Sequence, residues 1–460
     1  MGECEPIYEF DKPREACGVF GVYAPGEDVV QLAYLGAEAL QHRGQDAAGL
    51  MVSSSESGMY GVKDEGLVSE VLTDNVVNGL KDEKAHSAIA HTRYGTSSQA
   101  GFDSAQPIYR ELVNGRHFAL VHNGHIEGLT SDNKSDSETF ADMLVEEIRQ
   151  GEMIERALMR VAAKTDGAYS IVIMTDDRVI GLRDRNGFRP LELGELKNGG
   201  GFVIASETAA LEQIDADHDR QILPGEVVSV GSHGIWSDMY ADPEPKLCAF
   251  EYIYFARPST EINDISVHEA RKTMGRLLAE QGVPEADAVV GVPDSGVPAA
   301  KGFSEASGIP DVIGLEKNRY ISRTFIKDNQ LSREKAVGLK LTPLKSEIKG
   351  QRLIVVDDSI VRGTTTRALT SMLRHAGAEE VHLKIASPPY KWPCFYGMDT
   401  GNPDEFLANQ HNYEGMVKEL GVDSLDYLSI DNLKHSVGPM AGKICMACLD
   451  GDYPTPKTVK

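Results

Sequence analysis

The first half of the chain alternates between short apolar runs and glycine-rich breaks, up to about residue 230. Runs rich in Val and Ile are typical of β-strands, and they predict strands at 167–175, 178–183 and 202–206. Helical spacing of the apolar residues predicts helices at 29–40 and 137–150, where Asp136 can cap the start and Gly151 follows the end. Mixed strands and helices in this order favour a layered α+β domain.

The pattern changes after the proline-containing stretch at 242–245, which predicts a linker. Beyond it, continuous apolar runs alternate with helical segments. The predicted strands are 286–293, 353–356 and 381–387, with a helix around 366–375. Buried strands that alternate with helices predict a parallel sheet with crossover helices. We therefore expect two domains, at 17–243 and 244–460.

The composition excludes several classes of protein. Of the 460 residues, 41% are hydrophobic and 25% are charged, which is ordinary for a folded globular protein. The net charge of −24 would repel phosphate backbones and argues against a general nucleic-acid binder. Six cysteines are too few for a disulfide framework, and no run approaches the roughly 18 apolar residues of a membrane span. We expect a cytoplasmic enzyme that has neither nucleic acid nor a membrane as its partner.

The most informative motif is LIVVDDSIVRGTTTRA at 353–368. A buried strand leads into two adjacent carboxylates, Asp357 and Asp358, and then into a loop of Ser, Gly and Thr before a helix. Such a loop at the carboxyl end of a parallel strand offers hydroxyls and backbone N–H groups to a phosphate. The paired acids suit ribose hydroxyls or Mg²⁺ beside that phosphate. A plain polar turn would account for the Gly and Thr residues but not for the two acids.

This segment resembles the signature of type I phosphoribosyltransferases, which bind 5-phosphoribosyl-1-pyrophosphate (PRPP). The resemblance implies an α/β domain with a parallel sheet, in which Asp357 and Asp358 contact the ribose hydroxyls and Mg²⁺. A second loop, 292–296, is similar to the family's pyrophosphate loop and implies that Ser295 contacts the metal or the pyrophosphate. The remaining PRPP contacts that it implies are Ser359, Arg362, Gly363, Thr364, Thr365 and Thr366, of which 362–366 would hold the 5-phosphate.

The segment 317–345 lies between these two loops and carries eight basic residues against two acids. A solvated basic loop is one interpretation. The segment also lacks a helical or strand period, and a long loop within a compact domain is often a lid or disordered. We favour a basic lid that would exclude water and neutralise charge over a pyrophosphate leaving group.

The first half carries its own candidate chemistry, beginning at Cys17. A cysteine nucleophile needs a base, and an N-terminal cysteine has one in its own α-amine, whose usual pKa is near ~8. Residues 1–16 are acidic and lack the apolar core of an export signal. We expect this leader to be removed on maturation, so that Cys17 becomes the N-terminus. Taken alone, Cys17 is better explained as a buried structural cysteine.

Four downstream segments accompany this candidate nucleophile: QHRGQDAAG at 41–49, HTRYGTSS at 91–98, HNG at 122–124 and SDSE at 135–138. Together they resemble the N-terminal-nucleophile glutamine amidotransferases, whose fold is an αββα sandwich. The resemblance implies that Asn123 and Gly124 form the oxyanion hole. It also implies that glutamine is bound by Arg43, Arg93 and Asp136. A zwitterionic amino acid suits one fixed cation and one fixed anion, and a tetrahedral intermediate suits donors at its oxygen.

Four more cysteines remain once Cys17 and the leader are set aside. Cys445 and Cys448 form a CxxC pair, which on its own suits zinc, a redox pair or an iron–sulfur cluster. Cys248 and Cys394 complete a set of four thiols, and Cys394 lies among aromatic residues and prolines that could shield a cluster. Spacing alone does not separate zinc from an iron–sulfur cluster.

The two halves together resemble the amidophosphoribosyltransferase family over residues 16–455. The resemblance includes FARPS at 255–259, RTFI at 323–326 and CFYGMDT at 394–400. It implies conversion of PRPP, glutamine and water to 5-phosphoribosylamine, glutamate and pyrophosphate, with ammonia channelled from Cys17 to the PRPP site. It also implies a homo-oligomer (dimer or tetramer) that is inhibited by purine nucleotides. The subgroup with a cleaved leader and a 4Fe–4S cluster is the most similar, which implies the ligands Cys248, Cys394, Cys445 and Cys448.

Two other functions share parts of this pattern. Another N-terminal-nucleophile amidotransferase, such as glucosamine-6-phosphate synthase or asparagine synthetase, would not need the PRPP loop at 353–368. A redox-sensing or nucleotide-sensing regulator built on an inactive phosphoribosyltransferase could lose the glutaminase residues, yet all of them are present. An intact set of reactive residues in both halves makes the regulator the weaker hypothesis.

Overall fold

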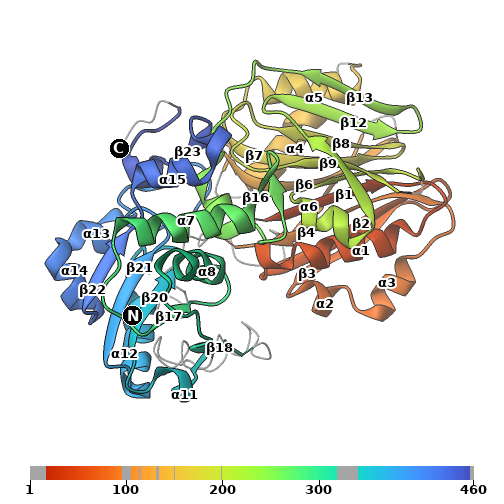
Figure 1. Ribbon diagram of the computed structural model, residues 1–460. Coiled ribbons are helices and arrows are strands. Elements are labelled where there is room, and N and C mark those ends of the chain that lie inside the picture. The colour runs from red at the N-terminus through yellow and green to blue at the C-terminus, as the bar shows by residue number, and fades with distance from the viewer. Residues whose placement is uncertain are drawn as a thin grey trace, which may run out of the picture.

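The computed structural model describes residues 17–95, 105–112, 115–130, 134–149, 151–197, 199–318 and 340–455. Two units lie side by side in Figure 1, a first one coloured red to yellow-green and a second one coloured green to blue. The proposed leader, 1–16, lies outside the described residues, and so does most of the proposed lid, 319–339. Among the described residues, every helix is too short or too polar to span a lipid bilayer.

The first unit is built on two antiparallel sheets packed face to face. The seven-stranded sheet has the order β11-β9-β10-β1-β4-β2-β3. Its strands are β1 Gly18–Tyr23, β2 Ala47–Ser54, β3 Gly58–Glu65, β4 Ala85–Arg93, β9 Glu192–Leu196, β10 Phe202–Ala205 and β11 Ala216–Gln221. The six-stranded sheet has the order β13-β12-β8-β7-β6-β5. Its strands are β5 Ile108–Glu111, β6 His117–Ile126, β7 Gly167–Thr175, β8 Arg178–Arg183, β12 Glu226–Gly231 and β13 Gly234–Met239.

Helices cover the outer face of each sheet. The seven-stranded sheet is covered by α1 Val29–Ala39, α2 Val68–Val71, α3 Asp74–Leu80 and α6 Thr208–Gln213, and the six-stranded sheet by α4 Asp136–Ile148 and α5 Ile154–Ala162. Apolar residues of both sheets, among them Val19 and Val172, form a third core between them. These layers confirm the expected αββα sandwich.

Several local predictions are confirmed and one is wrong. The strands expected at 167–175 and 178–183 are β7 and β8, with those bounds. Asp136 does not cap α4; Ser135 does, because its hydroxyl accepts from the Glu138 N–H while the Glu138 carboxylate accepts from the Ser135 N–H. Asp136 is instead the first residue of the helix, which leaves its carboxylate directed toward other groups.

The second unit contains the expected parallel sheet, with strands β17 Ala288–Gly291, β20 Arg352–Asp357, β21 Glu380–Ile385 and β22 Ser424–Tyr427 in that order. All three strand pairs are parallel. The helices include α7 Val267–Gln281, α8 Gly296–Ser307, α11 Lys345–Ile348, α12 Thr364–Ala376, α13 Leu407–Gln410, α14 Tyr413–Leu420, α15 Ile430–Ser436 and α16 Ala447–Asp450. Two hydrophobic cores form around this sheet.

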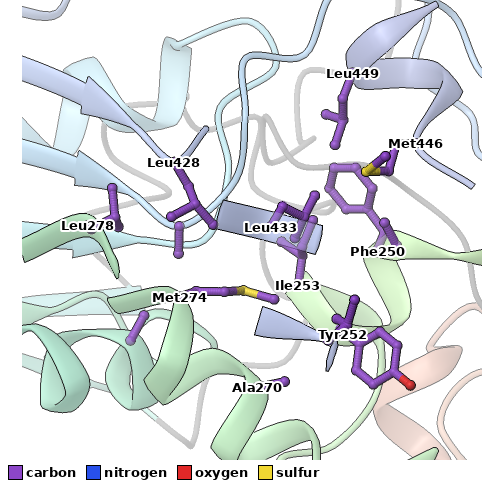
Figure 2. Packing of buried hydrophobic residues seen from close by; sticks show 14 of the residues in the cluster. Phe250, Tyr252, Ile253, Ala270, Met274, Leu278, Leu428, Leu433, Met446 and Leu449 are labelled. Atoms are coloured by element: carbon purple, nitrogen blue, oxygen red, sulfur yellow. The ribbon is translucent and has the colours of Figure 1, made fainter. Parts of the chain in front are cut away.

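Short elements complete the second unit. β14 Leu247–Cys248 pairs in parallel with β23 Ile444–Cys445, so the start and the end of this unit lie together. The described ends of the basic segment are also strands, since β18 Leu315–Lys317 pairs with β19 Leu341–Pro343. A π-helix at Glu251–Phe255 follows β14, and Figure 2 shows its residues Tyr252 and Ile253 among apolar side chains of α7 and the C-terminal segment.

Two candidate active sites and a group of four thiols

Cys17 lies at the entry to β1, in the interior of the seven-stranded sheet. The residue is 8% exposed, and its Sγ lies 3.9 Å from the carbonyl oxygen of Tyr94. The next residue, Gly18, donates its N–H to the Thr92 hydroxyl at 3.2 Å, and that hydroxyl donates to the Leu40 carbonyl at 3.1 Å. A side chain at position 18 would lie 2.5 Å from the Thr92 hydroxyl, so the strand approaches β4 more closely than any other residue permits. The thiol is therefore held in a fixed position.

Asn123 and Gly124 lie near the end of β6 in the other sheet. The Asn123 side chain is fully buried, yet neither its amide nitrogen nor its amide oxygen has a hydrogen-bond partner within the described residues. Gly124 has φ +132°, and a Cβ there would lie 1.9 Å from the Ala168 carbonyl oxygen. Buried amides are normally paired, so an unpaired one provides donors for a bound ligand.

Two buried histidines link the strands that carry these groups. His91 on β4 donates from Nε2 to the His122 carbonyl at 3.0 Å, and His122 directly precedes Asn123. Burial lowers the pKa of His91 to about 3 and also lowers the pKa of His122. Both rings are therefore neutral near pH 7. Because Thr92 adjoins His91, this bond brings the Cys17 end of β1 and the Asn123 end of β6 to the same region.

Asp136 and Arg93 are the described residues with charges expected for glutamine. The Asp136 carboxylate accepts from the Ile126 N–H at 2.9 Å and the Ser137 N–H at 2.7 Å, and it lies 3.6 Å from His125. Its side chain is 15% exposed, so it is fixed but accessible. Arg93 is the last residue of β4, next to Thr92. The remainder of the HTRYGTSS motif, from residue 96, lies outside the described residues.

Arg43 lies at the contact between the two units. Its guanidinium donates to Glu207 and, at 2.7 and 2.9 Å, to both oxygens of Glu251. All three side chains are fully buried. Glu251 begins the π-helix of the second unit, so Arg43 joins the two units.

Asp357 and Asp358 lie at the carboxyl end of β20, as expected from the motif. Both residues are buried. One Asp358 oxygen accepts from the Ser359 hydroxyl at 2.7 Å and the other accepts from the Ser295 hydroxyl. The Asp358 N–H donates to Asp357 at 2.9 Å. The acids, together with these hydroxyls, form an oxygen-rich strand end.

The two PRPP loops predicted from the sequence are neighbours in space. The Val292 N–H donates to the Val356 carbonyl at 2.9 Å, and a Cβ at Gly296 would lie 2.6 Å from the same carbonyl oxygen. This close approach sets Ser295 beside Asp358. In the same loop, Asp294 forms an ion pair with Lys317, at the described start of the basic segment.

The loop after the acids leads into α12. Gly363 has φ +83° and immediately precedes Thr364, the first residue of that helix. The Arg362 guanidinium is directed away from this loop. It donates to Glu405 at 2.9 Å and to the Thr400 carbonyl at 3.4 Å. The backbone N–H groups and hydroxyls of Thr364, Thr365 and Thr366 stand at the helix start, where an anion is favoured.

The four remaining cysteines gather at the junction of β14 and β23. The strand register sets Cys248 beside Cys445. Each of the four thiols interacts electrostatically with the other three, and none forms a disulfide. Burial raises the pKa of Cys248 to about 12 and raises the pKa values of Cys445 and Cys448 well above their usual range. Such thiols stay protonated near pH 7 unless a cation replaces the proton.

The described residues include no group of three or more His, Cys, Asp or Glu side chains arranged to hold a metal ion. A tetrahedral zinc site would hold four sulfurs about 3.8 Å apart, since each Zn–S bond is about 2.3 Å. In a 4Fe–4S cluster each thiolate binds a different iron, so its four sulfurs stand farther apart.

Motif analysis did not identify three further candidate residues, His91, His122 and Gln106. His91 and His122 stand inside the HTRYGTSS and HNG segments, but their burial and their mutual bond follow only from the pairing of two sheets. Gln106, whose side chain accepts from the His122 N–H at 2.7 Å, lies outside every motif. Alternation along β4 and β6 could have placed the two histidines on one face, but not Gln106.

Comparison with known proteins yields matches in both halves. A family model of the glutamine amidotransferase domain matches residues 96–213, and one of the phosphoribosyl transferase domain matches residues 259–386. The chain is 43% identical over 471 residues to the amidophosphoribosyltransferase of Mycobacterium tuberculosis strain H37Rv, which covers 98% of this chain and 88% of that protein. It is 39% identical over 461 residues to the amidophosphoribosyltransferase of Bacillus subtilis strain 168, which covers 96% and 94%.

Solved structures match over the same extent. The glutamine PRPP amidotransferase of B. subtilis complexed with ADP and GMP has a TM-score of 0.86 at 39% identity, covering 96% of this chain and 98% of that chain. A structure described as the allosteric regulatory enzyme of purine biosynthesis has a TM-score of 0.87, also at 39% identity, and covers 96% of each chain. The likeness therefore includes both units.

Proposed function

Because the chain belongs to the amidophosphoribosyltransferase family, we propose that it converts PRPP, glutamine and water to 5-phosphoribosylamine, glutamate and pyrophosphate. This reaction is the first committed step of purine synthesis. The observation that carries the proposal is the presence of two reactive sets in one chain. One is a buried thiol in the glutamine amidotransferase half, and the other is the acidic strand end in the phosphoribosyl transferase half.

In the first half, Cys17 attacks the amide carbon of glutamine, ammonia leaves, and water hydrolyses the thioester to glutamate. The Asn123 amide and the Gly124 N–H donate to the oxygen of the tetrahedral intermediate. The unpaired, buried Asn123 side chain supports this role. Arg93 binds the glutamine carboxylate and Asp136 binds its amino group, which the fixed and accessible Asp136 carboxylate supports. We propose this assignment of roles from the family resemblance.

The base for Cys17 is its own α-amine, which requires removal of residues 1–16. An amine with a pKa near ~8 accepts the thiol proton and later returns it to the leaving ammonia. Intact mass of the mature protein tests this step. A chain that begins before Cys17 and still hydrolyses glutamine would contradict it.

In the second half, Asp357 and Asp358 hold the ribose hydroxyls of PRPP, the 362–366 loop holds its 5-phosphate, and Ser295 contacts its pyrophosphate. Mg²⁺ fits this strand end, since it needs only one or two carboxylates along with substrate phosphates and water. Asp357, Asp358 and Ser295 are the residues that would hold it. When bound, Mg²⁺ supplies charge neutralisation for the pyrophosphate that leaves from C1.

Ammonia passes from the first site to the second and attacks C1 of PRPP. Free ammonia is mostly protonated in water near pH 7 and then cannot act as a nucleophile, so the passage must exclude water. Tyr252 and Ile253 of the π-helix are buried directly after Glu251, the residue that contacts Arg43 of the other unit, which supports exclusion of water there.

Cys248, Cys394, Cys445 and Cys448 bind a structural 4Fe–4S cluster. The gathering of four buried or half-buried thiols, each of which interacts electrostatically with the others, supports this. A cluster formed on folding would contribute its binding energy to stability, so its oxidative loss should unfold the C-terminal segment. Stoichiometric zinc with no iron or sulfide in the active protein would contradict the cluster.

The cellular setting follows from the same resemblance. The enzyme acts in the cytoplasm as a homo-oligomer, a dimer or tetramer, and purine nucleotides inhibit it. A structural relative complexed with ADP and GMP supports nucleotide binding. Inhibition of phosphoribosylamine formation by added AMP or GMP, together with the mass of the assembly in solution, tests both statements.

Two substitutions separate the half-reactions. Cys17→Ala should abolish glutamine-dependent synthesis and retain synthesis from added ammonium salt, because the PRPP site is untouched. Asp357→Asn should impair both routes, because it weakens the hold on ribose or metal. Pyrophosphate and glutamate released in each assay are the measurements. Glutamine-dependent activity in Cys17→Ala would mean that another group is the nucleophile, and glutamate release without PRPP consumption in the unaltered protein would favour a different amidotransferase.

A further inference from the structure

The contact between the two units contains a buried ion cluster centred on Arg43. This residue ends a short 3₁₀-turn, Gln41–Arg43, in the glutaminase half. Glu207 immediately precedes α6 in the same half, whereas Glu251 begins the π-helix of the other half. The three side chains have no exposed surface. Burial alone would lower the Arg43 pKa, but the two carboxylates outweigh it and raise that pKa.

Glu207 extends the cluster to further groups of both halves. One carboxylate oxygen accepts from His42 at 2.7 Å as well as from Arg43. The other oxygen accepts from the Thr260 hydroxyl at 2.6 Å and from the Arg257 N–H at 3.0 Å, both in the second unit. One oxygen of Glu207 thus binds His42 and Arg43 of its own unit, and the other binds the second unit.

On the PRPP side, a second buried arginine holds the π-helix. Arg271 of α7 donates from Nε to the Tyr252 carbonyl at 2.7 Å and from its guanidinium to the Ala256 carbonyl at 2.8 Å. Its charge interacts with Asp358 at the PRPP strand end and with Glu251. The π-helix therefore lies between Arg43 and Arg271, and Figure 2 shows Tyr252 and Ile253 beside Ala270 and Met274 of α7.

On the glutamine side, Arg43 follows the segment that supports the nucleophile. Leu40, three residues earlier, accepts from the Thr92 hydroxyl, which in turn accepts from the N–H of Gly18, next to Cys17. Gly44, the next residue, is so close to β4 that a Cβ would lie 2.5 Å from the Thr92 backbone. Arg43 thus cannot shift without moving the backbone around the thiol.

We propose that Arg43 is a positioning residue that fixes the π-helix against the glutaminase site, so that ammonia released at Cys17 reaches PRPP instead of solvent. Glu251 and Glu207 are its partners, and the buried Arg271 holds the other end of the π-helix by hydrogen bonds to the Tyr252 and Ala256 carbonyls. The inference rests on the proposed function for the two half-reactions, and it gives Arg43 a different role from the glutamine contact implied by the family resemblance. Π-helices often occur at functional sites, which agrees with this placement.

The experiment compares Arg43→Lys, Glu251→Gln and the double variant in the full-length enzyme. Lysine keeps the charge but cannot bridge two carboxylates with a planar fork. We expect ammonia-dependent synthesis to remain near that of the unaltered enzyme. The ratio of glutamate released to phosphoribosylamine formed should rise about fivefold or more, because ammonia escapes. The ratio in the double variant should be no higher than in either single variant, since both substitutions remove the same contact.

The matched control is Arg178→Lys, because Arg178 also bridges two carboxylates, Glu155 and Asp177, but within the first unit. The ratio should stay unchanged in this variant. An unchanged ratio in Arg43→Lys, or additive effects in the double variant, would overturn the proposal. A higher KM for glutamine at an unchanged ratio would instead assign Arg43 to glutamine binding. Lack of both glutamine- and ammonia-dependent synthesis in the unaltered enzyme would contradict the proposed function itself.

Discussion

Single buried side chains in the glutaminase half keep unused hydrogen-bonding atoms. Both polar atoms of the Asn123 amide, Nδ1 of His91 and Nε2 of His122 are buried with no partner among the described residues. Buried polar atoms are nearly always paired in folded proteins, and an unpaired one costs about 1–3 kcal/mol. Their concentration around HNG indicates that this region is arranged for a ligand more than for stability.

Replacing Asn123 should therefore affect catalysis more than folding. In Asn123→Ala, we expect the kcat of glutamine hydrolysis to fall by about 10²–10³, the usual effect of removing one oxyanion donor. The melting temperature should change little, because the amide loses no partner. Steady-state glutamate release and thermal unfolding measure the two effects. A variant that loses stability but keeps its kcat would assign Asn123 a structural role.

Residue identities were predictable from motifs, but their partners were not. The acids Asp357 and Asp358 stand at a strand end because an apolar run precedes them, and that run is visible in the sequence. The environment of Arg43 depends on Glu207 and Glu251, which lie 164 and 208 residues away along the chain. Local sequence patterns do not predict contacts between residues so far apart in the chain. The motif therefore identified Arg43 but not its partners.

At the scale of elements, helix starts show how side chains compete for one backbone position. Ser135 and Asp136 are both good N-cap residues, and the sequence alone favoured the acid. The structure uses Ser135 because Glu138, three residues later, completes a reciprocal pair of bonds. Asp136 is left free of capping and accepts from Ile126 and Ser137 instead.

The cap should be measurable as a local contribution to stability. Ser135→Ala should lower the free energy of unfolding by about 1 kcal/mol, because one helix N–H loses its partner. Thr73→Ala is the matched control, since Thr73 occupies the cap position of α3 without a side-chain bond. Denaturant titration of both variants measures the difference. Equal losses would mean that hydroxyl capping does not stabilise α4.

Long, regular elements were predictable because their period repeats many times. β7 and β8 match their predicted bounds, and the run at 353–356 lies within β20. β14 and β23 were not predicted, because each has only two residues and forms only when its distant partner arrives. The basic segment likewise lacks a period, although its described ends pair as β18 and β19.

For the whole molecule, buried polar groups join the two units. Arg43 and Glu251 form one contact, at 2.7 Å, and Arg189 donates to the Tyr396 carbonyl at 2.9 Å in another. The Phe188 ring also stacks on Tyr396, with ring centres 4.2 Å apart. Polar contacts fix orientation more tightly than apolar ones, since their geometry is directional. The relative placement of the units should therefore depend on protonation.

Acid should weaken this contact through Glu207. Burial would raise its pKa, but His42 and Arg43 outweigh burial and hold the pKa well below 4.5. The stability that it contributes is present above pH 4.5 and is lost as the pH falls toward the lower folded-state value. Glu207→Gln should lower the free energy of unfolding by about 3 kcal/mol near pH 7, because Arg43 would keep only one buried counter-charge.

The same variant should also change the shape of the pH profile. The amide introduced by Glu207→Gln does not titrate, so the free energy of unfolding should fall less steeply between about pH 5 and 3 than in the unaltered protein. Urea unfolding at several pH values measures how the free energy of unfolding depends on pH in the variant and in the unaltered protein. Arg43, His42 and Arg271 are the groups that interact electrostatically with position 207. If the free energy of unfolding falls equally steeply in both proteins, other carboxylates determine the loss of stability in acid.

The pairing of β14 with β23 has a consequence for synthesis on the ribosome. The first unit is complete in the chain by β13, and it can fold while the rest is translated. β14 emerges next but must wait for β23, near the end of the chain, before it gains a partner. Its neighbour in register, Cys445, is equally late. Any group held jointly by Cys248 and Cys445 can therefore be inserted only when translation is nearly finished, and a prematurely terminated chain would retain the glutaminase but never assemble its four thiols.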